Sequence, residues 1–314
     1  MKKAVPFLVA LGIILAVVAL TRVVGNRYVY FAGYVILQYI VLATAWNILG
    51  GYAGYVNFGT AGFFALGAYT ALVLILAFKA PLGVQILAGG LVAGLLGLGI
   101  GYLTLRLKGV FFSIATLALA LVLQTVMTNW EYVGGGKGTT VARPATMPLF
   151  ATYVEFLFVV MAALAVGSVL IAWWIQNSRI GRGLAAIRDN EEAAECMGVP
   201  TLRLKLFATV VSGFLLGVAG APFPYYVTLV EPTSAFSMDY AVNSLAMPMI
   251  GGTGTWMGPV VGAILLGTAQ QIATVTISSE LNLLIVGIVL VAFVLLAPKG
   301  IVGLAQDLFR KMIS

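Results

Sequence analysis

Apolar residues are arranged along the chain in ten runs, separated by polar or glycine-rich connections. The runs fall at about 5–24, 29–49, 55–78, 83–105, 110–130, 152–176, 206–228, 240–250, 259–277 and 281–297. All except 240–250 are long enough for a helix to cross the ~30 Å hydrocarbon core of a bilayer. The pattern predicts an all-α integral membrane protein with about ten (eight to ten) transmembrane helices. The run 240–250 is expected to be a short or re-entrant helix.

Composition narrows the class of protein. The chain of 314 residues is 61% hydrophobic and only 9% charged, with a mean hydropathy of +1.08. Soluble domains carry about 25% charged residues, so these few charges cannot cover a surface that faces water. A soluble enzyme, a disordered regulator and a fibrous protein are all excluded.

The first run allows two interpretations. Met1, Lys2 and Lys3, followed by apolar residues to Leu20, are similar to the start of a signal peptide. A convincing small-residue cleavage site is missing, however, and many more apolar runs follow. An uncleaved first helix at about 5–24 is therefore favoured.

Lys and Arg residues give the orientation, because cytoplasmic loops of membrane proteins are enriched in them. Ten crossings from an inside N-terminus place twelve inside and five outside. The inside set is Lys2, Lys3, Arg106, Lys108, Arg179, Arg182, Arg188, Arg203, Lys205, Lys299, Arg310 and Lys311. The outside set is Arg22, Arg27, Lys79, Lys137 and Arg143. Both termini are therefore predicted to face the cytoplasm, and the net charge of +7 reflects this bias rather than nucleic-acid binding.

Residue types that support catalysis are scarce. The chain has no histidine and one cysteine, Cys196, which excludes a Ser-His-Asp triad, a His-ligated metal and an internal disulfide. The glycine-rich run 134–139 lacks the spacing of a phosphate-binding loop. We assign no catalytic residue, no metal ligand and no bound cofactor to this chain.

The source of energy follows from where the ionisable residues lie. Nearly all of them are in connections or at the ends of runs, and Glu155 comes closest to membrane depth. Carriers driven by protons or sodium generally need charged groups within their spans. The driving energy is therefore expected from another subunit. A stand-alone secondary carrier or channel, and a membrane-bound enzyme or structural subunit, remain as less favoured alternatives.

Two glycine-rich clusters interrupt the apolar runs. The glycines singled out in them as gating or packing positions are Gly50, Gly51, Gly54, Gly251, Gly252 and Gly254. So many helix breakers predict non-helical backbone near membrane depth, which is tolerated where it is buried in protein or lines an aqueous path. The clusters are expected either to line or gate a path, or to form plain cytoplasmic turns between helices.

Residues 177–205 form the one sizeable polar segment. Asp189 and Glu192 have the spacing of a capping box, Gly198 is a natural C-terminal cap, and Pro200 prevents continuation. We predict a helix of two to three turns outside the bilayer, with a small-residue face of Ala193, Ala194 and Met197. Either a docking element or an ordinary solvated loop would fit this pattern.

The polar segment also carries a resemblance to a known family. Glu192-Ala193-Ala194 followed by Gly198 resembles the EAA loop of ABC-importer permeases, which docks onto the ATP-binding subunit. Other stretches are similar to branched-chain amino-acid permeases of the LivM type, in colinear order over about 30–304. They are Trp46 to Gly54, Phe63 to Thr70, Asn129 to Gly135, Gly258 to Ala263 and Pro298 to Leu304. One departure is the run 55–60, where the family often shows a Gln-Leu-Ser-Leu-Gly-His-like sequence.

The resemblance implies that 1–314 form a single permease domain of the cytoplasmic membrane. Its implied companions are a second, homologous LivH-type permease, two ATP-binding subunits that hold ATP and Mg, and an extracytoplasmic substrate-binding protein. The implied solute is a branched-chain amino acid, and urea or a short amide is the alternative within the same family.

The resemblance also implies roles for individual residues. ATPase coupling would fall on a helix at about 190–198. The coupling candidates are Arg182, Arg188, Glu191, Glu192, Ala193, Ala194 and Gly198. Hydroxyls and amides are expected to line the path, with Asn57, Thr60, Thr116 and Asn243 as the candidates.

Overall fold

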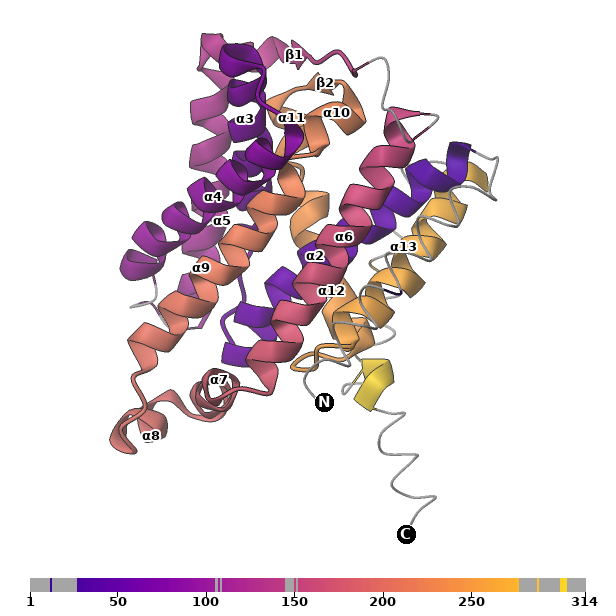
Figure 1. The fold of residues 1–314 in the computed structure, drawn as a ribbon. Coiled ribbons are helices and arrows are strands. Elements are labelled where there is room, and N and C mark those ends of the chain that lie inside the picture. The colour runs from indigo at the N-terminus through magenta and orange to yellow at the C-terminus, as the bar shows by residue number, and fades with distance from the viewer. Residues whose placement is uncertain are drawn as a thin grey trace.

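The computed structural model describes residues 12, 27–104, 107, 109–144, 150, 152–276, 287 and 300–303. Within them, long helices pack into a bundle with short helices and a two-stranded sheet at its ends (Figure 1). The elements are α2 (Arg27–Ala53), α3 (Thr60–Phe78), α4 (Leu82–Thr104), α5 (Val110–Thr128), η1 (Glu131–Val133), η2 (Gly135–Lys137), β1 (Thr139–Thr140), α6 (Tyr153–Gln176), α7 (Arg179–Asp189), α8 (Glu191–Cys196), α9 (Thr201–Gly220), α10 (Phe223–Val227), β2 (Leu229–Val230), α11 (Pro232–Ala235), α12 (Met238–Gly251) and α13 (Gly258–Thr276). The predicted spans at 5–24 and 281–297 lie outside the described residues, apart from positions 12 and 287.

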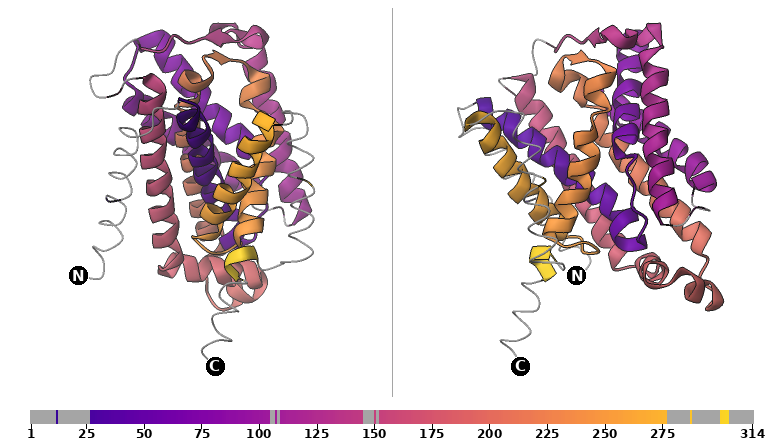
Figure 2. Two further views of the ribbon diagram at one scale, coloured as in Figure 1. Left: turned by 90° about the vertical axis from the view of Figure 1, so that its right-hand side faces the viewer. Right: turned by 180° about the vertical axis from the view of Figure 1, so that it is seen from behind.

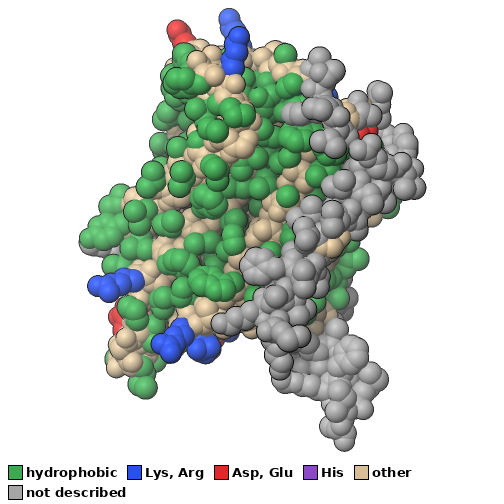
Figure 3. All heavy atoms as spheres, in the orientation of Figure 1, with side chains coloured by type: hydrophobic (Ala, Val, Ile, Leu, Met, Phe, Trp, Pro, Cys, Tyr) green, Lys and Arg blue, Asp and Glu red, His purple; other side chains and the backbone are tan. Residues whose placement is uncertain are grey.

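Six stretches of the described chain are long and apolar enough to cross a membrane. They are Tyr28–Ala53, Thr60–Phe78, Leu82–Thr104, Val110–Thr128, Tyr153–Gln176 and Thr201–Val227. Each coincides with a predicted run, so the helical, multi-span class is confirmed. Hydrophobic side chains cover the middle of the face in Figure 3, and charged side chains gather toward its ends. Such a surface suits a protein whose sides contact lipid.

Two predicted boundaries are wrong. α3 begins at Thr60 rather than near 55, because residues 54–59 form a loop that opens with Gly54 at a φ of +79°. α9 begins at Thr201 rather than near 206, so Lys205 belongs to the helix and not to the polar segment. The apolar pattern stopped at this lysine, whereas the structure buries it in an ion pair.

The short run near 240–250 is confirmed as a short helix. α12 has 14 residues, too few to cross ~30 Å at about 1.5 Å per residue. The Ser237 hydroxyl caps its start by accepting a hydrogen bond from the Asp239 N–H, and Gly252, with a φ of +129°, follows its end. A glycine-rich loop then leads into α13.

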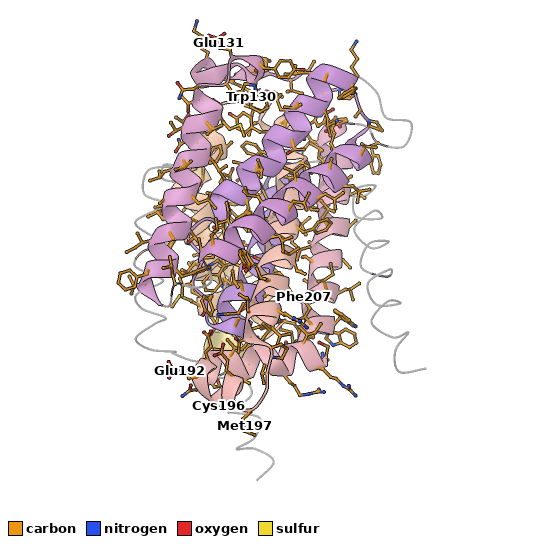
Figure 4. All side chains as sticks on the ribbon, turned by 90° about the vertical axis from the view of Figure 1, so that its left-hand side faces the viewer. Trp130, Glu131, Glu192, Cys196, Met197 and Phe207 are labelled. Carbon is orange, nitrogen blue, oxygen red and sulfur yellow. The ribbon has the colours of Figure 1, made fainter. Side chains whose placement is uncertain are left out.

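The long helices connect two ends of the bundle (Figures 1 and 2). The α8 end carries α7, α8 and the loops 54–59 and 252–257. The sheet end carries η1, η2, α10, α11 and the antiparallel strands β1 and β2, in which Thr139 faces Val230 and Thr140 faces Leu229. Figure 4 shows the separation, with Trp130 and Glu131 at one end and Glu192 at the other.

Glycines bring the backbones of α3, α4 and α9 together. A Cβ on Gly217 of α9 would lie 2.4 Å from the carbonyl oxygen of Gly89 in α4. A Cβ on Gly67 of α3 would lie 2.1 Å from the carbonyl oxygen of Gly217. Only hydrogen fits at these positions, and close backbone approach is what holds helices together in lipid.

Substitution of Gly217 tests this three-helix crossing. Gly217→Ala places a methyl group against backbone that cannot rotate away, so it is expected to destabilise the bundle by about 1–3 kcal/mol. The thermal unfolding midpoint of the purified protein in detergent should fall. Gly99→Ala in α4 is the matched control, since nothing lies within 4 Å of its added Cβ. Equal midpoints for the two variants would contradict the packing role.

Candidate functional site

Polar caps define the two short helices at the α8 end. The Ser178 hydroxyl accepts hydrogen bonds from the backbone N–H groups of Ile180 and Gly181 and starts α7. The Asn190 side chain accepts from the Ala193 N–H at 3.0 Å and starts α8. The predicted capping box is therefore wrong by one residue: Asn190, rather than Asp189, is the N-cap. An asparagine oxygen serves this position as well as an aspartate does.

The end of α8 is a Schellman motif. The Gly198 N–H donates to the carbonyl of Glu195 at 2.9 Å, and the Val199 N–H donates to the carbonyl of Ala194 at 3.0 Å. Gly198 has a φ of +81°, which favours glycine. The prediction that Gly198 caps this helix is confirmed. α8 has six residues, fewer than the predicted two to three turns.

One face of α8 packs on the chain and the other projects from it. Ala194 is 5% exposed and belongs to the core, whereas Met197 is 84% exposed. Glu192, Ala193 and Cys196 are exposed as well, and Figure 4 places Glu192, Cys196 and Met197 at the extremity of the bundle. The predicted face of Ala193, Ala194 and Met197 is thus divided, because residues 193 and 194 lie about 100° apart around a helix.

An ion pair joins α8 to α9. The Lys205 ammonium donates to Glu191 Oε1 at 2.6 Å, and the two side chains are only 5% and 18% exposed. The Tyr55 hydroxyl donates to Glu191 Oε2 at 2.5 Å and accepts from Lys205 Nζ at 3.1 Å. Burial raises the pKa of Tyr55, and its hydrogen bond to Glu191 raises it further, so the hydroxyl stays protonated and remains a donor.

The two glycine-rich clusters meet at the same end. Asn47 of α2 joins them, because its Nδ2 donates to the Thr255 carbonyl at 2.9 Å and its Oδ1 accepts from the Gly254 N–H at 3.1 Å. A Cβ on Gly51 would lie 2.8 Å from the nitrogen of Gly254. The loop 252–257 is therefore held against the end of α2.

Arg188 ties α7 to this junction. Its Nη1 donates to the Gly51 carbonyl at 3.3 Å, and a Cβ on Gly254 would lie 2.8 Å from the same nitrogen. The guanidinium also pairs with Asp189 at 3.2 Å. Arg182, on the same helix, is exposed.

The prediction of non-helical backbone is right for part of each cluster. Gly54, Gly252 and Gly254 have positive φ and lie in or beside loops. Gly50 and Gly51 are helical positions of α2, and Gly251 is the last residue of α12, so the prediction is wrong for these three. Their lack of a side chain serves packing: a Cβ on Gly50 would lie 2.6 Å from the Trp46 ring.

Two of the candidate path residues lie where the loop 54–59 meets α5. Asn57 Oδ1 accepts a hydrogen bond from the Gly59 N–H at 2.7 Å. The Thr116 hydroxyl accepts from the Phe58 N–H at 3.2 Å. Both side chains are buried, so in this conformation they stabilise the loop 54–59.

The other two candidates bond side chains of other helices. The hydroxyls of Thr60 and Ser244 are 3.1 Å apart, which links α3 to α12. Asn243 donates to the Tyr39 hydroxyl at 3.2 Å and accepts from Gln270 at 2.8 Å. Each of the four candidates is thus hydrogen-bonded to a different partner, and they do not form one continuous site.

Sequence reasoning missed Tyr55, Lys205 and Asn47 as site residues. Their partners are distant in the chain, 136 residues for Tyr55 with Glu191 and 208 for Asn47 with Thr255. A lysine next to an apolar run was the one available signal, since such a charge needs a partner when a helix buries it. Among the described residues, no group of three or more His, Cys, Asp or Glu could hold a metal ion.

Comparison with known proteins assigns the class and then the family. A bundle with six membrane-capable stretches is a multi-pass membrane protein. The family described as "Branched-chain amino acid transport system / permease component" matches residues 27–294. The chain belongs to this family, and it resides in the cell membrane.

Similar proteins in other organisms are named as permeases. One relative is LivM of Escherichia coli (strain K12), a high-affinity branched-chain amino acid transport system permease protein. It is 27% identical over 293 residues, which cover 85% of this chain and 68% of the LivM chain. A probable branched-chain amino acid transport permease protein LivH of Methanocaldococcus jannaschii is 27% identical, and the match covers 82% of this chain and 86% of the LivH chain. One solved structure, a putative metal-chelate type ABC transporter in an inward-facing conformation, has a TM-score of 0.45 at 16% identity. The superposition covers 94% of this chain and 100% of that chain. A TM-score this low supports no conclusion about this chain.

The Asn47 bridge gives a direct test of the junction between the glycine clusters. Asn47→Leu leaves the partly buried Gly254 N–H and Thr255 carbonyl without this partner, and each lost hydrogen bond costs about 0.5–1.5 kcal/mol. The thermal unfolding midpoint in detergent should therefore fall. Asn177→Ala is the control, because that exposed amide bonds the Trp173 carbonyl of the adjoining helix end. An unchanged midpoint in Asn47→Leu would show that the bridge contributes nothing.

Proposed function

We propose that this chain is the membrane-spanning permease of an ABC importer for branched-chain amino acids, with 1–314 as its single domain. ATP and Mg reside on two companion ATP-binding subunits, and an extracytoplasmic protein delivers the solute. The family match and the names of the relatives support the transport class and the solute. The scarcity of ionisable groups within the described spans supports an external source of energy.

The observation that carries the proposal is α8. It is capped at both ends, one face is buried against the chain, and Glu192, Ala193 and Met197 project from the bundle. When a partner displaces the exposed face of such a helix, the displacement passes to the helices that its buried face contacts. This is what docking onto an ATP-binding subunit requires, and it suits the resemblance of Glu192, Ala193, Ala194 and Gly198 to the EAA loop.

The coupling segment, predicted at about 177–205 and limited here to α7 and α8, reaches the long helices through three contacts. Glu191 is paired with Lys205 of α9, Arg188 is bonded to Gly51 of α2, and Ala194 is packed in the core. In our proposal, closure of the ATP-binding subunits moves this segment as a unit. The helices that it contacts then open the path to one side of the membrane or the other.

The outward faces of α4 and α5 are the proposed contact with the homologous second permease. These two spans have the smallest buried shares of the six, 33% and 22%. Ser113, Gln124 and Thr128 follow one stripe of α5 at helical spacing, and none of them is buried. A partly exposed amide such as Gln124 is costly against lipid, so this stripe suits a path or a protein neighbour better.

The candidate path residues are proposed to belong to the same region. Asn57, Thr60 and Thr116 lie at or near the base of α5, where the loop 54–59 is bonded to that helix. In our proposal they form a wall of the path that α5 borders, with Asn243 deeper in the bundle.

The α8 end is proposed to face the cytoplasm, within a ten-span arrangement that has both termini inside. Among the described side chains, this end carries Arg179, Arg182, Arg188, Arg203 and Lys205, and the sheet end carries Lys79, Lys137 and Arg143. The excess of basic residues follows the positive-inside rule.

Docking through α8 is tested by substituting its exposed and capping residues. Glu192→Ala and Gly198→Val should lower ATP-dependent leucine uptake about tenfold or more, the effect of losing about 1.4 kcal/mol of docking energy. The chain should still reach the membrane, while co-purified ATPase decreases. Lys137→Ala at the opposite end is the control. Unaltered uptake in both α8 variants would contradict docking. Parallel assays with labelled urea distinguish the alternative solute.

Orientation is tested with single cysteines at positions 137 and 190 in a Cys196→Ser background. A membrane-impermeant maleimide applied to intact cells should label position 137 and leave 190 unlabelled. Labelling of both positions from the same side would contradict the proposed topology. Detergent-permeabilised cells provide the control for reactivity, because both positions should then be labelled.

A further inference from the structure

Tyr55 occupies a position that the proposed coupling route passes through. Its hydroxyl is hydrogen-bonded to both charged groups of the buried ion pair, 2.5 Å from Glu191 Oε2 and 3.1 Å from Lys205 Nζ. The ammonium of Lys205 also lies 5.0 Å from the centre of the Tyr55 ring. The ring meets Phe112 of α5 edge-on, with centroids 5.1 Å apart. One side chain thus contacts α8, α9 and α5.

The chemistry of this position needs a hydroxyl. The same oxygen accepts a hydrogen bond from an ammonium and donates one to a carboxylate, and phenylalanine can do neither. Tyrosine supplies both this hydroxyl and the ring that packs on Phe112.

The residues after Tyr55 are bonded to α5. The Ser113 hydroxyl donates to the carbonyl of Val56 at 2.8 Å, and the Phe58 N–H donates to the Thr116 hydroxyl at 3.2 Å. A Cβ on Gly59 would lie 2.7 Å from the carbonyl oxygen of Thr116. The loop 54–59 is thus attached to α8 through Tyr55 and to the start of α5 through its backbone.

The two attachments define a mechanical link. Within this chain, α5 is the least buried of the six membrane-capable stretches, and its outward face is the proposed contact with the second permease. α9, by contrast, is largely buried and is held by the glycine crossing with α3 and α4. A displacement of Glu191 would pass through Tyr55 to α5 and so to that contact, in addition to the ion pair of Glu191 with Lys205 of α9.

We propose that Tyr55 is a positioning residue that transmits movement of α8 to α5 through the loop 54–59, with the Glu191–Lys205 pair holding its hydroxyl in place. This inference rests on the proposed function, because the movement it transmits is the one that ATP-binding subunits would impose. It adds a specific route: from Glu191 to Tyr55, then through the loop backbone to Ser113 and Thr116.

Tyr55→Phe tests the link with the loss of one oxygen atom. The complete transporter, with its companion subunits, is reconstituted in lipid vesicles, and leucine uptake and ATP hydrolysis are measured together. We expect ATP hydrolysis without solute to persist and the complex to remain assembled, while leucine moved per ATP falls about tenfold, equivalent to about 1.4 kcal/mol. Tyr132→Phe, which alters an exposed tyrosine at the sheet end, should behave like the unaltered protein.

Combining Tyr55→Phe with Glu191→Gln shows whether the two residues act as a unit. If the link runs through their hydrogen bond, the double variant should lose no more transport per ATP than the more affected single variant. Additive losses would overturn the route through Glu191.

Two further outcomes would overturn the proposal itself. One is transport per ATP in Tyr55→Phe equal to that of the unaltered protein. The other is a parallel fall in uptake, hydrolysis and thermal midpoint with the ratio unchanged, which would reduce Tyr55 to a structural contact. Failure of the proposed function is read separately, from the unaltered complex, as leucine uptake that is absent or independent of ATP.

Discussion

Close contact between backbones at glycine is the constraint on which this structure depends. Helices in lipid gain little from burying apolar side chains against each other, because lipid tails are equally apolar. The bundle is held instead where side chains are absent, as at Gly67, Gly89 and Gly217. The same device recurs between α12 and α13, where a Cβ on Gly262 would lie 1.8 Å from the carbonyl oxygen of Met247.

This close packing determines where polar groups gather. Glycine brings the end of α2 against the loop 252–257 and leaves room for Asn47 and Arg188 to bond both segments. At the same end, Tyr55 and Lys205 hold Glu191, the first residue of α8. The α8 end is therefore a network of charge-assisted and amide hydrogen bonds attached to a rigid apolar bundle. In the proposed function, this network is what joins the short surface helix to the membrane-spanning helices.

Several features could be predicted because they depend on local sequence. The spans follow from lengths of apolar run, and the short α12 follows from a run too short to cross. Gly198 as the cap of α8 follows from the need for positive φ after a helix. Two wrong predictions concern where helices begin. Asn190 rather than Asp189 is the N-cap of α8, since either side chain suits that position, and Lys205 lies inside α9, where it is paired with Glu191.

By itself, the sequence determined the membrane class, the positions of most spans and the polar segment with its capped helix, since hydrophobic length and capping depend on residues next to one another. Only the tertiary structure decided that the two glycine clusters meet, that Ala194 is buried while Met197 projects, and that Tyr55 bonds both Glu191 and Lys205. The contacts of Tyr55 and of the glycine clusters join residues more than a hundred positions apart in the chain. They arise from how helices cross, which no periodicity along the chain encodes.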